Sequence, residues 1–206
     1  SLYSSASPFS TPLLVRLLPT THFTLTPPIA ASPTNGRIFG GTAAADGQFP
    51  FIASLNNPDH QFCAGVIINT NWVLTSAECI FEVTNTSTVL VGTNSQTSGG
   101  TTYNIAATVQ HENFITITEG DDIGLIQIDG QFEMGDTVQV AEFGDPDGVN
   151  ATCMAVGWGW LPDWNYSAEL QFVEVAALSN ADCVTISGVH LGSIKVGDGQ
   201  VCSLGA

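Results

Sequence analysis

The stretch from Trp72 to Cys79 places the strongest constraint on how this chain can fold. It opens with three apolar residues, Trp72, Val73 and Leu74, then changes to small and polar residues and ends in a cysteine. Aromatic and β-branched residues are enriched in strands, and a run this short is better suited to a strand than to a helix. The stretch therefore predicts a short buried strand that ends at a turn next to Cys79.

Similar short apolar runs recur between turn residues along the whole chain. The 206 residues include 21 glycines and 10 prolines, a pattern that favours an all-β protein over a helical one. A chain of this length buries about 70% of its unfolded surface and could form one or two domains. No apolar run approaches the ~20 residues that a membrane-crossing helix needs, so we expect no membrane partner.

The charge of the chain is strongly one-sided. It has 19 acidic and 3 basic residues, Arg16, Arg37 and Lys195, and a formal net charge of −16 at pH 7. Nucleic acid and anionic lipid would repel such a chain, so we expect neither as a partner. A solvated acidic surface accounts for this charge. The scarcity of Lys and Arg would also protect the chain from proteases that cleave after basic residues, as in a digestive fluid.

The five cysteines and three glycosylation sequons point to an oxidising, extracellular setting. The cysteines are widely spaced and form none of the close pairs that zinc sites use, so we expect no metal and no cofactor. Sequons of the form N-x-S/T mark surface asparagines in secreted proteins. They begin at Asn85, Asn150 and Asn165.

Residues 1–37 differ in composition from the rest of the chain. They are rich in Ser, Thr and Pro and contain no Asp, Glu or Cys. The apolar run around Leu13 and Leu14 has the character of a signal-peptide core, but Arg16 interrupts it. We expect a disordered or removable leader.

Motifs in a fixed order resemble the chymotrypsin- and trypsin-like serine proteases (peptidase S1), and in detail most resemble insect chymotrypsin-like digestive enzymes. The order is the strongest part of the resemblance, because each motif alone is only moderately specific. The motifs are R-I-F-G-G from Arg37, F-P-x-x-x-S-L from Phe49, W-V-L-T-S-A-E-C from Trp72, D-I-G-L-I from Asp122 and C-x-x-x-G-W-G from Cys153.

The resemblance implies an all-β fold, the trypsin-like double β-barrel. In the family, the segment G-D-S-G-G with the nucleophilic serine follows the part matched here, so we expect a complete first barrel, a truncated second one and no nucleophile in this chain. The expected divisions are a leader over 1–37, the first barrel over 38–130, a linker over 131–150 and an incomplete second barrel over 151–206.

At two positions the resemblance bears directly on catalysis. Asp122 matches the aspartate of the catalytic triad, whereas Glu78 stands where the family motif W-V-L-T-A-A-H-C has the catalytic histidine. In the family the aspartate orients that histidine, which takes the proton of the serine. The resemblance therefore implies a catalytically inactive homologue. A proton-sharing pair or a cation site formed by Glu78 and Asp122 is the less favoured alternative.

The resemblance also implies disulfides and a cleavage site. It pairs Cys63 with Cys79 and Cys183 with Cys202, and it leaves Cys153 unpaired because the family partner lies beyond the matched part. It places activation cleavage between Arg37 and Ile38.

Taken together, these expectations describe a secreted, extracellular protein of the gut lumen or a similar fluid. Its partner would be a polypeptide substrate, a peptide ligand or an active protease, and the completed chain would be a monomer. The alternatives are a fragment of a digestive endopeptidase and a non-catalytic binding or regulatory pseudoprotease.

Overall fold

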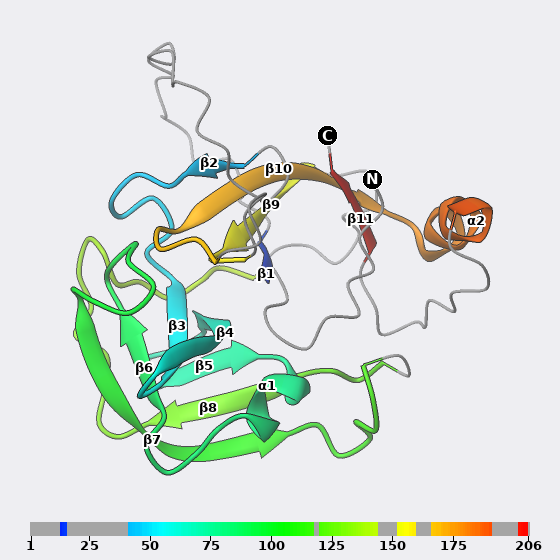
Figure 1. Cartoon of the computed structure of the whole chain (residues 1–206). Helices are drawn as coiled ribbons and strands as arrows, with labels where there is room; N and C mark the ends of the chain where they lie inside the picture. Colours follow the sequence, from blue (N-terminus) through cyan, green and yellow to red (C-terminus); the bar gives the residue numbers. More distant parts are fainter. Residues whose placement is uncertain are drawn as a thin grey trace.

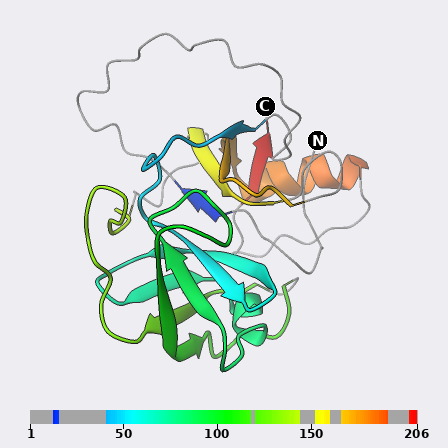
Figure 2. The same ribbon diagram turned by 60° about the vertical axis from the view of Figure 1, so that its left-hand side comes forward.

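The computed structural model describes residues 13–15, 41–117, 120–143, 152–159, 166–190 and 202–205. These residues form two bodies, a closed β-barrel and a smaller open sheet that lies against one side of it (Figures 1 and 2). The predicted cleavage site at Arg37 and Ile38 and the sequons at Asn150 and Asn165 lie outside the described residues.

The barrel closes through antiparallel pairing of six strands in the order β3-β4-β5-β8-β7-β6. Closure leaves no strand edge exposed, which protects the barrel from edge-to-edge association. The strands are β3 (Ile52–Asn57), β4 (His60–Ile67), β5 (Trp72–Thr75), β6 (Thr88–Val91), β7 (Thr101–Gln110) and β8 (Gly124–Ile128).

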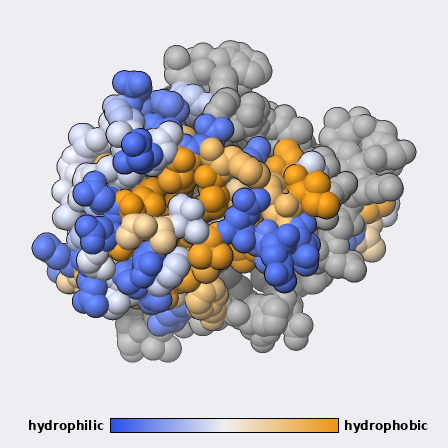
Figure 3. All heavy atoms as spheres, turned by 90° about the horizontal axis from the view of Figure 1, so that it is seen from below, coloured by the Kyte–Doolittle hydropathy of each residue, from blue (hydrophilic) through white to orange (hydrophobic). Residues whose placement is uncertain are grey.

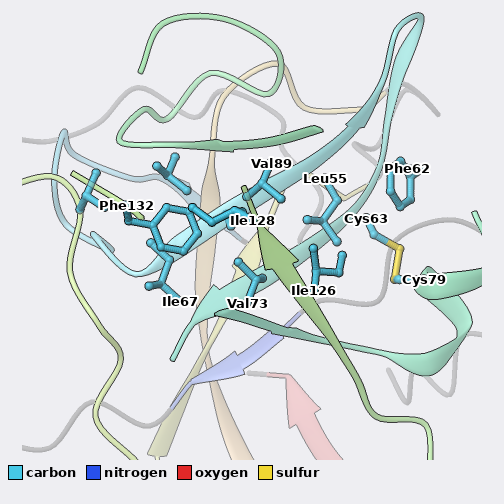
Figure 4. Packing of buried hydrophobic residues seen from close by; sticks show 13 residues of the cluster. Leu55, Phe62, Cys63, Ile67, Val73, Cys79, Val89, Ile126, Ile128 and Phe132 are labelled. Carbon is cyan, nitrogen blue, oxygen red and sulfur yellow. A yellow bond between two sulfur atoms is a disulfide. The ribbon is translucent and has the colours of Figure 1, made fainter. Parts of the chain in front are cut away.

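Alternating apolar residues fill the barrel. Val73 is fully buried while its neighbours Trp72 and Leu74 are only partly covered, and Ile126 and Ile128 show the same alternation along β8. Phe132 and Val138 of the predicted linker join this core and close one side of it. Figure 4 shows the packing, to which Leu55, Phe62, Ile67 and Val89 also contribute.

The hairpin of β6 and β7 illustrates how turn residues set the register. Val89 pairs with Tyr103, as expected for two strands on either side of a Ser-Gly-Gly turn. Gly99 and Gly100 both have positive φ, 74° and 53°, a conformation that glycine adopts without steric cost. The two strands therefore form a hairpin closed by this glycine turn.

The second body is a five-stranded sheet in which β10 is central. β10 (Gln171–Leu178) pairs with β9 (Thr152–Gly157) on one side and with β11 (Cys202–Gly205) and β2 (Thr42–Ala43) on the other. Among the described residues this sheet is open. Its remaining strand, β1 (Leu13–Val15), pairs antiparallel with β9.

β1 lies inside the segment that was expected to be a disordered leader, so this expectation is wrong for these three residues. Leu13 pairs with Val156 and Val15 with Met154. The outer edge of β9 presents unpaired N–H and C=O groups, and an extended apolar segment satisfies them. The leader thus supplies a strand to the second body.

The described residues also form two helices, so the protein is mostly β with a closed six-strand barrel, which confirms the coarser part of the expected fold class. α1 (Ala77–Phe81) begins after Ser76, whose hydroxyl accepts the N–H of Cys79. α2 (Asn180–His190) begins after Ser179, whose hydroxyl accepts the N–H of Asp182 and donates to its carboxylate. A serine in this position is an N-cap, which satisfies backbone N–H groups that the helix leaves free.

Residues of both bodies form a shared apolar cluster between the barrel and the sheet. The backbone carbonyl of Asn94 accepts hydrogen bonds from the N–H of Leu170 and the indole N–H of Trp158, each at 2.8 Å. These bonds fix the sheet against the barrel. The buried members of the cluster are Phe49, Phe51, Ile52, Val66, Val156, Trp158 and Leu170.

Gly65 of β4 provides a test of the packing between β4 and β5, because it leaves no room for a side chain there. A Cβ atom at Gly65 would lie 2.8 Å from the carbonyl oxygen of Leu74 and would also overlap Val73. We expect Gly65→Ala to lower the free energy of unfolding by about 2 kcal/mol, as measured by urea denaturation. Gly135 has open space around it, so Gly135→Ala should change stability by less than about 0.5 kcal/mol. Equal stabilities of the two variants would contradict the packing.

Candidate active site

The helix α1 brings Glu78 to Asp122, which lies just before β8. The backbone N–H of Glu78 donates a hydrogen bond of 2.8 Å to Oδ1 of Asp122. The two residues are 44 positions apart in the sequence. The structure therefore joins the two positions that the sequence singled out for catalysis.

The disulfide between Cys63 and Cys79 ties α1 to the barrel. Its Cα atoms are 6.0 Å apart, and the two cysteines are separated by 16 positions (Figure 4). In the chain-entropy model, closing a loop of this length stabilises the fold by about 3 kcal/mol. This is the pair that the family resemblance implied, and it holds the residue next to Glu78 in place.

Gly124 allows the start of α1 to lie directly on β8. A Cβ atom at Gly124 would be 2.7 Å from Cγ1 of Ile80 and 3.0 Å from the carbonyl oxygen of Ser76. Side chains at this position would push the helix away from the strand and lengthen the bond between Glu78 and Asp122. Gly124 is thus a positioning residue that motif matching did not reveal.

The backbone conformation and hydrogen bonds of the turn before β8 fix the position of Asp122. Asp121 has a φ of 56°, in the left-handed region that aspartate adopts more readily than most residues. The N–H of Ile123 donates to the carbonyl of Asp121, and the N–H of His111 donates to the carbonyl of Ile123. These bonds hold Asp122 between them, with its carboxylate directed at the N-terminus of α1.

Burial is the largest of the causes that raise the pKa of the Glu78 carboxyl above its ordinary value of 4.5, followed by the negative charges of Asp122 and Glu82. An imidazole at this position could donate an N–H to Asp122. A carboxylate has no such proton, so the side chains of Glu78 and Asp122 repel each other. The scaffold therefore holds two like charges at residues 78 and 122.

An exposed apolar surface lies beside this pair. Phe81, at the end of α1, is 67% exposed, and its ring centroid lies 6.0 Å from that of Phe114. Ile115 is 72% exposed, and Ile123 is also exposed. Seen from the side that carries β7, β8 and α1, apolar atoms lie across the middle of the face (Figure 3). Exposed apolar surface of this kind is common at sites that contact other proteins.

The other predicted residues are distributed as follows. Asn85 is exposed in the turn after α1, where a glycan would be accommodated. Cys153 is buried in β9. Cys183 is buried on α2 and is disulfide-bonded, whereas the side chain of its predicted partner, Cys202, lies outside the described residues. His60 is exposed at the start of β4.

No cofactor or metal site is evident in the described parts of the chain. They hold no group of three or more His, Cys, Asp and Glu side chains that could bind a metal ion. None of their helices is long and apolar enough to cross a membrane.

Comparison with known proteins identifies the family. The Trypsin family model matches residues 38–205. Trypsin Blo t 3 of Blomia tropicalis is 33% identical over 72% of this chain and 58% of its own length. Brachyurin of Leptuca pugilator is 31% identical over 80% of this chain and 73% of its own length. Trypsin delta of Drosophila melanogaster is 29% identical over 73% of this chain, and the match spans 61% of the relative's own length.

The structure gives the same result. A solved structure of neuropsin, a serine protease expressed in the limbic system of mouse brain, superposes with a TM-score of 0.69. It is 25% identical in sequence, and the match covers 81% of this chain and 74% of the other. The match of the family model over most of the chain, together with this shared fold, shows that the chain belongs to the trypsin family, peptidase S1.

Proposed function

We propose that this protein is a secreted trypsin-family homologue that binds polypeptides without hydrolysing them. One observation carries the proposal. The backbone of Glu78 is held by Asp122, but the side chain at this position is a carboxylate where the family motif has histidine.

The substitution removes the general base. The family's reaction needs a neutral imidazole that accepts the proton of the serine near pH 7 and returns it to the leaving group. A carboxylate of the usual pKa is too weak a base for this proton. Burial and the negative charge of Asp122 raise the pKa of Glu78 and so strengthen it as a base, but a carboxyl group lacks the second ring nitrogen through which the aspartate orients the histidine in the family.

Two observations support the proposed binding of polypeptides. They are the family to which the chain belongs and the apolar side chains on its surface. Members of this family act on polypeptides, and the exposed Phe81 of α1, the helix that carries Glu78, packs against the half-buried Phe114, which is followed by the exposed Ile115. Aromatic side chains on a surface often anchor protein partners. Secretion is supported by the disulfide between Cys63 and Cys79 and by the exposed sequon at Asn85.

Activity measurements test the proposal directly. We expect the full-length protein to hydrolyse fluorogenic casein at least about 10³-fold more slowly than an active trypsin at equal concentration. Casein should nevertheless co-elute with the protein in gel filtration. Hydrolysis within about 100-fold of trypsin would contradict the proposed loss of catalysis, and absence of co-elution would contradict binding.

Introducing a histidine at position 78 tests whether Glu78 is the cause of the proposed loss of catalysis. In a form of the protein that also carries the family's G-D-S-G-G segment, Glu78→His places an imidazole where Asp122 can accept its N–H, so we expect casein hydrolysis at least about tenfold above the same form with Glu78. Glu82→His is the matched control, since it adds an imidazole to the other end of the same helix, and it should leave activity unchanged. A silent Glu78→His protein would show that position 78 is not the cause of inactivity.

The raised pKa of Glu78 also predicts a pH-dependent stability. At pH values above 4.5 the unfolded carboxyl ionises more readily than the folded one, so Glu78 destabilises the fold progressively as pH rises through its folded pKa. Glu78→Gln removes this penalty. We expect the variant to raise the Tm by about 1 °C at pH 7 and by less at pH 4, with solvent screening keeping the effect small.

Thermal unfolding of the wild type and variant at both pH values measures this difference. Glu169→Gln is a suitable control, because Glu169 is exposed and its side chain is distant from the pair in sequence. A stabilisation by Glu78→Gln that is equal at pH 4 and pH 7 would show that charge repulsion is not its cause.

A further inference from the structure

A pocket lies on the flank of the barrel, between the tip of the β3–β4 hairpin and the loop that joins β6 to β7. Its volume is about 330 Å³, within the range of sites that hold small molecules or single side chains. It shares no residue with the Glu78 and Asp122 pair. The lining residues are Asn56, Asn57, Pro58, Asp59, His60, Thr88, Leu90, Thr97 and Thr102.

Asn56, which lines this pocket, has a side-chain oxygen without a hydrogen-bond partner. The side chain is only 8% exposed, and its Nδ2 donates to the hydroxyl of Ser54 at 3.0 Å and to the Ser54 carbonyl at 3.4 Å. Its Oδ1 is buried and has no hydrogen-bond partner. A buried amide oxygen without a partner is costly, and native proteins rarely keep one without a reason.

The neighbouring amides are already engaged and do not pair with this oxygen. Gln61, opposite Asn56 on β4, donates from Nε2 to the carbonyl of Cys63 and accepts at Oε1 from Gln96. Asn57 donates to the carbonyl of Glu82 and accepts from the hydroxyl of Ser87. These bonds hold the walls of the pocket in place and leave Oδ1 of Asn56 as the acceptor in need of a donor.

The charge of the pocket favours a cation. Asp59 contributes a carboxylate, and the described parts of the chain contain no Lys or Arg, because Arg16, Arg37 and Lys195 lie outside them. The net charge of −16 raises the concentration of cations near the whole surface. A ligand that suits the pocket therefore carries positive charge and several N–H donors.

We propose that this pocket binds an alkylguanidinium group, the group that an arginine side chain or a free alkylguanidine carries. Its planar fork of N–H donors suits the Asp59 carboxylate, and its aliphatic stem suits Pro58 and Leu90. The guanidinium reaches Oδ1 of Asn56 after a rotation of that side chain or through one bridging water.

Titration of the full-length protein with capped amino acids, followed by NMR or calorimetry, tests this ligand class. N-acetyl-arginine methylamide should bind with a dissociation constant of about 1–10 mM. The citrulline analogue, which has nearly the same shape and no charge, should bind at least about fivefold more weakly. The lysine analogue and glucose should also bind more weakly than the arginine compound.

A pentapeptide with one central arginine distinguishes the two sources of the group. Affinity equal to or higher than that of the capped amino acid indicates that the pocket accepts an arginine side chain within a polypeptide. A pocket that takes only the free form will bind agmatine and reject the pentapeptide.

Two variants locate the binding. Asp59→Asn should weaken binding of the arginine compound at least about fivefold, whereas Asp136→Asn, a matched change at another exposed aspartate, should leave it unchanged. Asn56→Leu should also weaken it, with thermal unfolding used to confirm that this variant is folded.

Three results would overturn the proposal. The first is absence of binding at 20 mM of the arginine compound, a concentration about 2-fold above its weakest expected dissociation constant. The second is equal affinity for the citrulline analogue. The third is unchanged affinity in Asp59→Asn. None of these results bears on the casein measurements, so failure here and failure of the proposed function are distinguishable.

Discussion

The hydrogen bond from the backbone N–H of Glu78 to Asp122 is the interaction on which the candidate site depends. It uses the main chain of residue 78 and therefore does not require histidine there. The features that position it are also independent of that side chain: the disulfide of Cys79 to Cys63, the Ser76 cap, and the close approach at Gly124. The fold of the trypsin family can therefore form with a glutamate at position 78.

One unfavourable interaction remains, the electrostatic repulsion between the carboxylates of Glu78 and Asp122. This repulsion is moderate because Glu78 is only partly buried. A fully buried pair of carboxylates would either share a proton or force the helix away from the strand. Here solvent screens the repulsion, so the N-terminus of α1 stays on Asp122. An anionic side chain in the first turn of α1 also interacts favourably with the helix dipole, although a helix this short gives only a small effect.

Much of the first barrel could be predicted because its signals are local. The alternation around Val73 and Ile126 and the Gly99-Gly100 turn each determine a strand or hairpin by themselves. Other features depend on long-range contacts that no local pattern encodes. The pairing of β1 with β9 and the space around Gly124 arise only when distant segments meet. α2 is an intermediate case, since its cap, formed by Ser179 and Asp182, is local in the sequence.

The proposed pocket and the candidate active site are joined by one hydrogen bond. Asn57, in the pocket wall, donates to the carbonyl of Glu82, which is the C-cap residue of α1. Such a connection transmits a signal only if some element between the sites has two arrangements that each ligand favours differently. α1 is held at one end by the disulfide and Asp122 and at the other by Asn57, and these contacts favour the one position that the structure shows. Occupation of the pocket should therefore leave the geometry at Glu78 unchanged, and the two sites should act independently.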